Sequence, residues 1–271
     1  MSKPFLIMTG IPRSGTTLTA ALVDRLEDTL CLNEPPRYYP WVEGAEDKAD
    51  FLRMFTADLQ NMYKVLESGG KVSDRREKDG TMPENYFDEN GQRRQFGFRS
   101  VGRPDRKRDL LLCVKHNEVF TAVLPELAER EDVQIIAIVR NPIPTMLSWQ
   151  AREIPLKYGH LTVGYRFWPE AKAIEEAGGL IIDIQAKMFE LYCARYWSMR
   201  DRITVIRYED LMANPGVLEE ATGRKIQGEV NIRSQNKKLS DRYGDARVSK
   251  MKELIQKHFS AVYNYYPSLD E

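Results

Sequence analysis

The sequence predicts an α/β fold in which a mostly parallel central sheet is flanked by helices. Short apolar runs at residues 5–9, 110–114, 135–139 and 203–206 have the length and composition of buried parallel strands. Segments with helical spacing of apolar residues lie between or after them, at residues 16–26, 50–66, 118–130, 182–199 and 248–263. Strands that alternate with helices in this way are typical of a parallel sheet with helices on both faces.

The length of 271 residues and the 42% hydrophobic content suit one large domain, and no linker divides the chain. We therefore expect a single domain over residues 1–271. Two irregular segments, at about 69–109 and 154–179, interrupt the alternation of strands and helices. Long connections in α/β proteins gather beyond the carboxyl ends of the strands, where ligands bind. Each segment is therefore either a solvated surface loop or a cover over the substrate.

The overall charge is balanced, with 40 Lys+Arg and 40 Asp+Glu residues. This balance argues against nucleic acid or a membrane surface as a partner, so any recognition of an anion must be local. No apolar stretch reaches the roughly 20 residues of a membrane helix, and we expect a cytoplasmic protein. The cysteines Cys31, Cys113 and Cys193 have no paired spacing, which predicts neither a zinc site nor a disulfide framework.

The first apolar run leads into a glycine-bounded turn, Gly10 to Thr17, at the start of a predicted helix. Backbone N–H groups and the helix dipole make such a turn a cradle for anions. The pattern is G-x-x-x-x-G-T-T, so Thr16 occupies the position where a nucleotide triphosphatase has its lysine. A cation, Arg13, lies inside the loop instead. The loop therefore lacks the charge clamp that ATP or GTP hydrolysis normally uses.

The run from Pro12 to Leu18 resembles the 5′-phosphosulfate loop of the sulfotransferases that use 3′-phosphoadenosine 5′-phosphosulfate. The arginine form is similar to that of bacterial and carbohydrate-directed members. The resemblance implies that Arg13 contacts the phosphosulfate and that adenosine 3′,5′-bisphosphate is the product. No metal is required in principle, because a sulfuryl group carries less charge than a phosphoryl group and fixed cations suffice. The residues assigned to this part of the cofactor site are Pro12, Arg13, Ser14, Gly15, Thr16 and Thr17.

A second motif begins with Arg140 at the end of a predicted strand, and Pro142 is well placed to open the next helix. Ser148 follows eight residues after Arg140, and this spacing resembles the 3′-phosphate motif of the same family. A guanidinium and a hydroxyl together suit a phosphate. Two weaker likenesses add Tyr208, in a Y-E-D-L stretch, and Lys238, in place of a basic loop of the family.

Transfer of a sulfuryl group to an alcohol needs a general base and stabilisation of the departing phosphate oxygen. Arg13 and Lys115 are the candidates for that stabilisation. Glu34 is the favoured base, because bacterial and carbohydrate sulfotransferases place a similar Glu-Pro about twenty residues beyond the loop. His116 competes, since cytosolic members use K-x-H, but the spacing here is one residue shorter and neighbouring strand residues face opposite ways. Glu118 is a third candidate.

The sequence thus predicts a sulfotransferase that acts on a hydroxyl of a sugar or another small molecule. Two alternatives stay open at this point. One is a P-loop kinase of nucleotides or small molecules, which would need ATP and magnesium. The other is a family member that binds nucleotide without catalysis. The sequence leaves the oligomeric state and the identity of the acceptor open.

Overall fold

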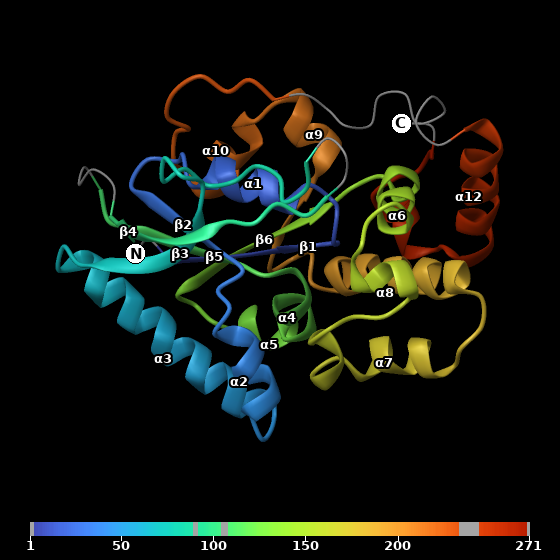
Figure 1. Ribbon diagram of the computed structural model, residues 1–271, viewed down its shortest axis with the longest axis horizontal. Helices are drawn as coiled ribbons and strands as arrows, with labels where there is room; N and C mark the ends of the chain where they lie inside the picture. Colours follow the sequence, from blue (N-terminus) through green and yellow to red (C-terminus); the bar gives the residue numbers. More distant parts are fainter. Residues whose placement is uncertain (1–2, 89–91, 104–107, 233–243, 270–271) are drawn as a thin grey trace.

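The computed structural model describes residues 3–88, 92–103, 108–232 and 244–269. Its centre is a sheet of five parallel strands in the order β2-β5-β1-β6-β7 (Figure 1). The strands are β1 (Phe5–Gly10), β2 (Thr29–Asn33), β5 (Leu111–Lys115), β6 (Val133–Val139) and β7 (Thr204–Arg207). The prediction of an α/β fold with a parallel sheet is therefore confirmed.

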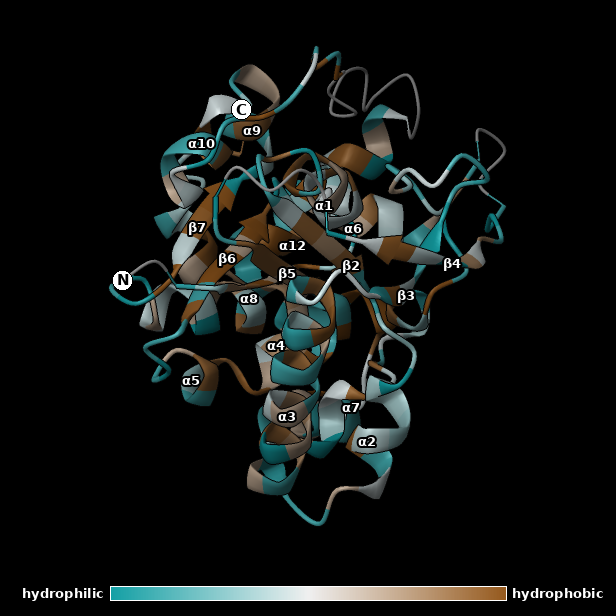
Figure 2. Cartoon of the chain, turned by 90° about the vertical axis from the view of Figure 1, so that its left-hand side faces the viewer, coloured by the Kyte–Doolittle hydropathy of each residue, from teal (hydrophilic) through white to brown (hydrophobic). Residues whose placement is uncertain are grey.

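The central strands are apolar throughout because both faces of the sheet are covered. In β1, Phe5 and Ile7 pack into one hydrophobic core, whereas Leu6 and Met8 pack into a second core on the opposite face. All six residues of β1 are buried. Figure 2 shows the same arrangement, with hydrophobic strands in the middle and more hydrophilic helices outside.

Helices cover both faces of the sheet (Figure 1). One face carries α1 (Thr16–Val23), α9 (Tyr208–Ala213) and α10 (Gly216–Thr222), whose apolar residues belong to the smaller core. The larger core is built with α3 (Lys48–Glu67), α4 (Asn117–Ala122), α5 (Leu124–Leu127), α6 (Pro142–Gln150), α8 (Ile181–Ser198) and α12 (Asp245–His258). The remaining described helices are α2 (Tyr38–Gly44), α7 (Pro169–Glu176), η1 (Pro155–Tyr158), η2 (Gly164–Arg166) and η3 (Ala261–Asn264).

Several elements differ from the sequence prediction. Strand β2 was not predicted, because its five residues follow α1 closely and include the polar ends Thr29 and Asn33. The helix predicted over 118–130 is divided into α4 and α5, with Pro125 in the first turn of α5. The last long helix runs from Asp245 to His258 rather than over 248–263.

The segment 69–109 contains two strands that the sequence analysis described as irregular. β3 (Lys71–Arg76) pairs in antiparallel fashion with β4 (Gly97–Gly102). The two-residue period of β3 was hidden because two of its three buried positions carry the charged residues Asp74 and Arg76. The Arg76 Nε lies 2.8 Å from the Asp74 Oδ2, so each charge is compensated by the other.

The segment 154–179 is also partly regular, since it contains η1, η2 and α7. All three cysteines are buried free thiols, in agreement with the prediction of neither a zinc site nor a disulfide framework among the described residues. Strand pairing brings the Sγ atoms of Cys31 and Cys113 to 3.2 Å from each other in the smaller core.

Candidate active site

The loop between β1 and α1 is held close to β6 and to Tyr208 of α9. A Cβ atom on Gly10 would lie 2.6 Å from the carbonyl oxygen of Ile138, and one on Gly15 would lie 2.5 Å from a ring carbon of Tyr208. Gly15 also has a φ of 93°, which disfavours any residue with a side chain. The two glycines therefore let the backbone approach its neighbours and turn sharply into the helix.

Arg13 is held inside this loop in the left-handed region, with a φ of 70°. Non-glycine residues in this region are strained, and such strain concentrates at functional sites. The Arg13 Nε donates to the Ser148 Oγ at 3.3 Å, and the Arg13 carbonyl oxygen accepts from the Arg140 Nη1 at 3.3 Å. The two predicted anion-binding motifs are thus in direct contact.

Helix α6 provides a third attachment for the loop between β1 and α1. The Trp149 indole Nε1 donates to the carbonyl oxygen of Pro12 at 2.6 Å. The helix itself begins as the sequence predicted, with Pro142 in its first turn and the Asn141 side chain accepting from the N–H of Ile143 at 3.0 Å.

Arg140 lies over the ring of Tyr208, with its guanidinium carbon 4.4 Å from the ring centroid. Because the same ring also lies close to Gly15, Tyr208 connects the loop to the second motif. A cation over an aromatic face is stabilised by the ring quadrupole. This contact therefore orients Arg140. It also places Tyr208, the first residue of the Y-E-D-L stretch, beside the other predicted site residues.

The hydroxyl groups of the loop divide into two sets. Ser14 is fully buried, and its Oγ donates to the carbonyl oxygen of Ile138 at 2.9 Å, so it fastens the loop to β6. Thr16 and Thr17 instead line the cavity above the loop. Lys238, which was also predicted to bind the cofactor, lies outside the described residues.

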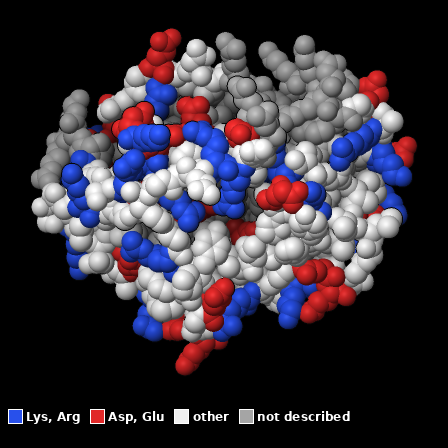
Figure 3. Space-filling model, viewed as in Figure 1, with Lys and Arg blue, Asp and Glu red and all other residues white. Residues whose placement is uncertain are grey.

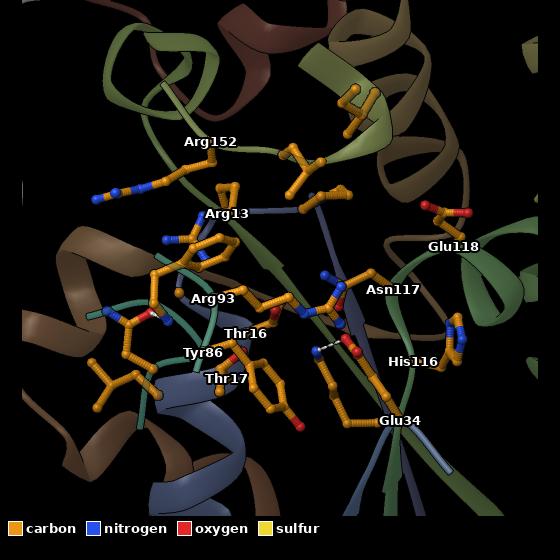
Figure 4. A pocket seen from close by; sticks show the side chains of 18 of the residues that line it. Arg13, Thr16, Thr17, Glu34, Tyr86, Arg93, His116, Asn117, Glu118 and Arg152 are labelled. Atoms are coloured by element: carbon orange, nitrogen blue, oxygen red, sulfur yellow. Dashed lines mark hydrogen bonds and ion pairs between the residues drawn. The ribbon is translucent and has the colours of Figure 1, made fainter. Parts of the chain in front are cut away.

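Glu34 and Lys115 meet at the carboxyl ends of the neighbouring strands β2 and β5. The Lys115 Nζ lies 2.5 Å from the Glu34 Oε1 (Figure 4). Burial by itself would raise the pKa of the Glu34 carboxyl, but the Lys115 ammonium outweighs it and the pKa is lowered to about 2. Glu34 is therefore an ionised carboxylate at neutral pH, and its φ of 51° places it in the left-handed region.

His116 follows Lys115 directly and caps α4, where its Nδ1 accepts from the N–H of Val119 at 3.3 Å. The expectation that its side chain faces away from the site is wrong, because β5 ends at Lys115 and both residues line one cavity. The ring is 3% exposed, and its Nε2 has no hydrogen-bond partner among the described residues. Burial lowers the pKa of His116 to about 4, so the ring is neutral at pH 7.

Glu118 has a structural role. Its Oε2 accepts from the N–H and the Oγ1 of Thr162, both at 2.9 Å, and from the N–H of Val163 at 3.1 Å. These bonds hold the segment 154–179 against α4. The third candidate base is thus already engaged by three donors.

All the predicted site residues that the structure describes, except Ser14 and Ser148, line one cavity of about 1600 Å³. Ligand sites for single small molecules are typically about 300–1,000 Å³, so this one has room for a donor and an acceptor together. Both irregular segments contribute to its wall, through residues 84–88, 93–94, 154–156 and 162–163. Figure 3 shows basic side chains gathered around a hollow on this face of the molecule, with acidic ones among them.

Several residues of the cavity wall were not predicted from the sequence: Tyr39, Arg75, Tyr86, Phe87, Arg93, Arg94 and Arg152. A cover over the substrate was one of the two predicted roles of the segment 69–109, but its paired arginines at 75–76 and 93–94 were not singled out. Phe87 illustrates the difficulty. Its ring lies 4.7 Å from the Arg13 guanidinium carbon and 5.5 Å from that of Arg152, contacts that depend on the tertiary fold.

Within the described parts of the chain, no three His, Cys, Asp or Glu residues cluster in a way that could hold a metal ion. No described helix is long and apolar enough to cross a membrane.

The fold and the site define an α/β protein with a glycine-bounded loop between its first strand and first helix. A family model described as "Sulfotransferase family" matches residues 4–223, and the chain therefore belongs to the sulfotransferase family and is an enzyme of that class. No curated protein gives a significant sequence match.

Two solved bacterial structures are similar. A sulfotransferase from Alicyclobacillus acidocaldarius is 15% identical with a TM-score of 0.42, and the match covers 97% of this chain and all of the other. The sulfotransferase STF1 from Mycobacterium tuberculosis H37Rv is 15% identical with a TM-score of 0.38, over 95% of this chain and 77% of the other.

Proposed function

We propose that this sulfotransferase moves the sulfuryl group of 3′-phosphoadenosine 5′-phosphosulfate to a hydroxyl of a sugar or another small molecule. The observation that carries the proposal is the contact between the two anion-binding motifs, through the Arg13–Ser148 and Arg140–Arg13 hydrogen bonds. A donor with anionic groups at both its 5′ and 3′ positions needs two such motifs in one cavity. A donor with a single phosphate chain would need only the loop.

The residues in and beside the cavity suit such a donor. The N–H groups of the loop, Arg13, Thr16 and Thr17 would hold the phosphosulfate, and Arg140 with Ser148 would hold the 3′-phosphate. Lys115 would stabilise the negative charge on the departing phosphate oxygen. The proposed role of Ser14 is indirect, because its hydroxyl fastens the loop to β6.

In the proposed reaction the acceptor oxygen forms a bond to sulfur while the bond from sulfur to the phosphate oxygen breaks. The electron pair of the broken bond goes to the phosphate oxygen, and the proton of the acceptor hydroxyl goes to the Glu34 carboxylate. Glu34 is ionised and lies beside Lys115, so base and cation are together at the reacting centre. His116 is the second candidate base, since its neutral Nε2 could accept the same proton.

Ligand binding tests the proposal against the kinase alternative. We expect adenosine 3′,5′-bisphosphate to raise the melting temperature by several degrees, and ATP with magnesium to raise it much less. Stabilisation by ATP with magnesium alone would refute the proposal. Transfer of label from a ³⁵S-labelled donor to an acceptor pool would exclude a protein that only binds nucleotide.

Two substitutions test the roles at the donor site. In Arg140→Ala, the preference for adenosine 3′,5′-bisphosphate over adenosine 5′-monophosphate should fall at least tenfold, because a charge-assisted bond to phosphate is worth about 1.5–3 kcal/mol. An unchanged preference would contradict the 3′-phosphate assignment. Glu34→Gln should lower kcat at least a hundredfold with little change in donor affinity. If His116→Ala has that effect instead, His116 is the base.

A further inference from the structure

Part of the cavity wall carries arginines for which the proposed donor site has no use. Arg75 comes from β3, and Arg93 and Arg94 come from the connection between β3 and β4. They are separate in the sequence from the phosphate loop and from the second motif. Their charge is therefore available for another ligand if it is not already neutralised.

The three arginines differ in this respect. The Arg94 Nη2 lies 2.8 and 3.0 Å from the two carboxylate oxygens of Glu77, so its charge is compensated. Arg75 lies over the ring of Phe98 at 5.4 Å. Within the described parts of the chain, neither Arg75 nor Arg93 forms an ion pair with a carboxylate. Neither of these two guanidinium groups is therefore neutralised by a direct ion pair.

The positive potential of these two arginines reaches the reacting centre. Burial raises the pKa of the Tyr39 and Tyr86 phenols, and the charges of Arg75 and Arg93 oppose this rise. Arg93 also contributes to the low pKa of Glu34. Figure 4 shows the Arg93 side chain pointing into the cavity toward the Glu34 carboxylate. A ligand group beside Glu34 is therefore exposed to this charge.

Two buried polar atoms of the cavity also lack partners. Tyr86 is 8% exposed and His116 is 3% exposed, and both residues line the cavity. The Tyr86 hydroxyl and the His116 Nε2 have no hydrogen-bond partner among the described residues. Buried polar atoms normally have a partner, because leaving one unpaired is costly. This pair of atoms independently indicates that a polar ligand belongs here.

None of the other carboxylates on the same wall forms an ion pair with Arg75 or Arg93 among the described residues. Glu43 and Glu84 are exposed to solvent, as Arg93 is. The Asp88 Oδ1 accepts from the N–H of Gln92 at 2.8 Å.

We propose that Arg75, Arg93 and Tyr86 form a subsite for an anionic group of the acceptor. The acceptor is then an acidic hydroxyl compound, one that carries a carboxylate or a sulfate near the hydroxyl that receives the sulfuryl group. We call these three residues the acidic-acceptor subsite. The inference rests on the proposed function, because the acceptor hydroxyl must lie beside Glu34 while the anionic group contacts the arginines.

Binding of matched sugars to the full chain saturated with adenosine 3′,5′-bisphosphate tests the inference. The probes are methyl glucoside, methyl glucuronide and methyl glucoside 6-sulfate, which share a ring and differ in charge. Dissociation constants come from ligand-observed NMR and do not depend on turnover. We expect the glucuronide or the 6-sulfate to bind at least tenfold more tightly than the neutral glucoside. The charged sugar that binds more tightly shows whether the subsite prefers a carboxylate or a sulfate.

The variants Arg75→Gln and Arg93→Gln should each reduce this preference at least threefold, and the double variant should abolish it. Arg99→Gln is the matched control, because Arg99 is an exposed arginine of β4 that does not line the cavity. It should leave the preference unchanged. Affinity for adenosine 3′,5′-bisphosphate should change less than twofold in all of these variants.

Equal binding of all three sugars, or a preference for the neutral one, would overturn the inference and leave the proposed function intact. A large loss of affinity for adenosine 3′,5′-bisphosphate in Arg93→Gln would also overturn it, because Arg93 would then belong to the donor site. If adenosine 3′,5′-bisphosphate fails to bind the unmodified protein, the proposed function itself fails.

Discussion

The Lys115 ammonium and the Glu34 carboxylate lie 2.5 Å apart at the ends of two adjacent parallel strands. The pair places a cation and a base at one point of the cavity. It also lowers the basicity of Glu34, because the ammonium stabilises the ionised carboxylate. In the proposed reaction, Glu34 would become a stronger base when the Lys115 ammonium turns toward the departing phosphate oxygen, so proton acceptance and leaving-group stabilisation would be coupled.

The first prediction concerns this coupling. In Lys115→Met, burial is no longer outweighed by the ammonium, so the pKa of Glu34 should rise from about 2 to above its ordinary value of 4.5. The measurement is an NMR titration of carboxyl-labelled glutamate between pH 4 and 8, with Glu34→Gln to assign the signal. Glu34 should titrate within this range only in the variant. A Glu34 signal that does not titrate in either protein would contradict the ion pair.

The second prediction concerns the close approach of Gly15 to Tyr208. Gly15→Ala would place a Cβ 2.5 Å from the ring in a backbone conformation with a φ of 93°. The ring must then move, and Arg140 loses its support. We expect adenosine 3′,5′-bisphosphate to bind at least tenfold more weakly, measured by calorimetry, with about 1–3 kcal/mol lost from the stability of the fold.

Gly80→Ala is the matched control for this experiment. Gly80 has a similar φ of 89°, but a Cβ there would meet nothing within 4 Å. The control should lose stability through backbone strain and keep its affinity for the nucleotide. If the two variants bind equally well, the contact of Gly15 with Tyr208 has no part in donor binding.

The third prediction concerns the attachment of the segment 154–179. Glu118→Gln removes the charge from an acceptor of three hydrogen bonds, which should cost about 1–3 kcal/mol. The amides of Thr162 and Val163 should exchange hydrogen at least tenfold faster, as measured by mass spectrometry.

A similar cluster elsewhere supplies the control. The Glu190 Oε1 accepts from the N–H and the Oγ of Ser260, at 2.9 and 2.7 Å, and from the N–H of Ala261 at 2.6 Å. Glu190→Gln should loosen residues 260–262 and leave 162–163 unchanged. Unaltered exchange at 162–163 in Glu118→Gln would show that other contacts hold this segment.

The elements that could be predicted from the sequence are those whose residue pattern lies within a short stretch of the chain. The strand, the glycine turn and the helix from Phe5 to Val23 are adjacent in the chain, and so are Arg140 and the start of α6. Each could be predicted from spacing and capping alone. The contact of Arg13 with Ser148 joins residues 135 positions apart, and no local pattern specifies it.

Tertiary contacts also explain what the sequence did not show. β3 carries buried charges because Arg76 pairs with Asp74 and donates to the carbonyl oxygen of Cys31 at 2.7 Å. A rule that expects apolar residues inside a strand fails at such a position. Similarly, Arg93 lines the cavity only because its segment folds back beside Phe87, where the two residues form a β-bridge.

The last prediction concerns acid stability and His116. The folded state lowers the pKa of His116 from 6.5 to about 4, because burial disfavours the charged ring. As the pH falls, the His116 ring is therefore protonated in the unfolded chain before it is protonated in the folded protein. The contribution of the neutral ring to the free energy of unfolding is fully present above pH 6.5. It is lost as the pH falls through 4, by about 3 kcal/mol in all.

In His116→Asn this loss should vanish, while the asparagine can still cap α4 by accepting from the N–H of Val119. Urea unfolding at pH 7 and pH 4 measures the difference between the two proteins. Parallel loss of stability in both would mean that His116 is not a buried neutral ring in the folded protein.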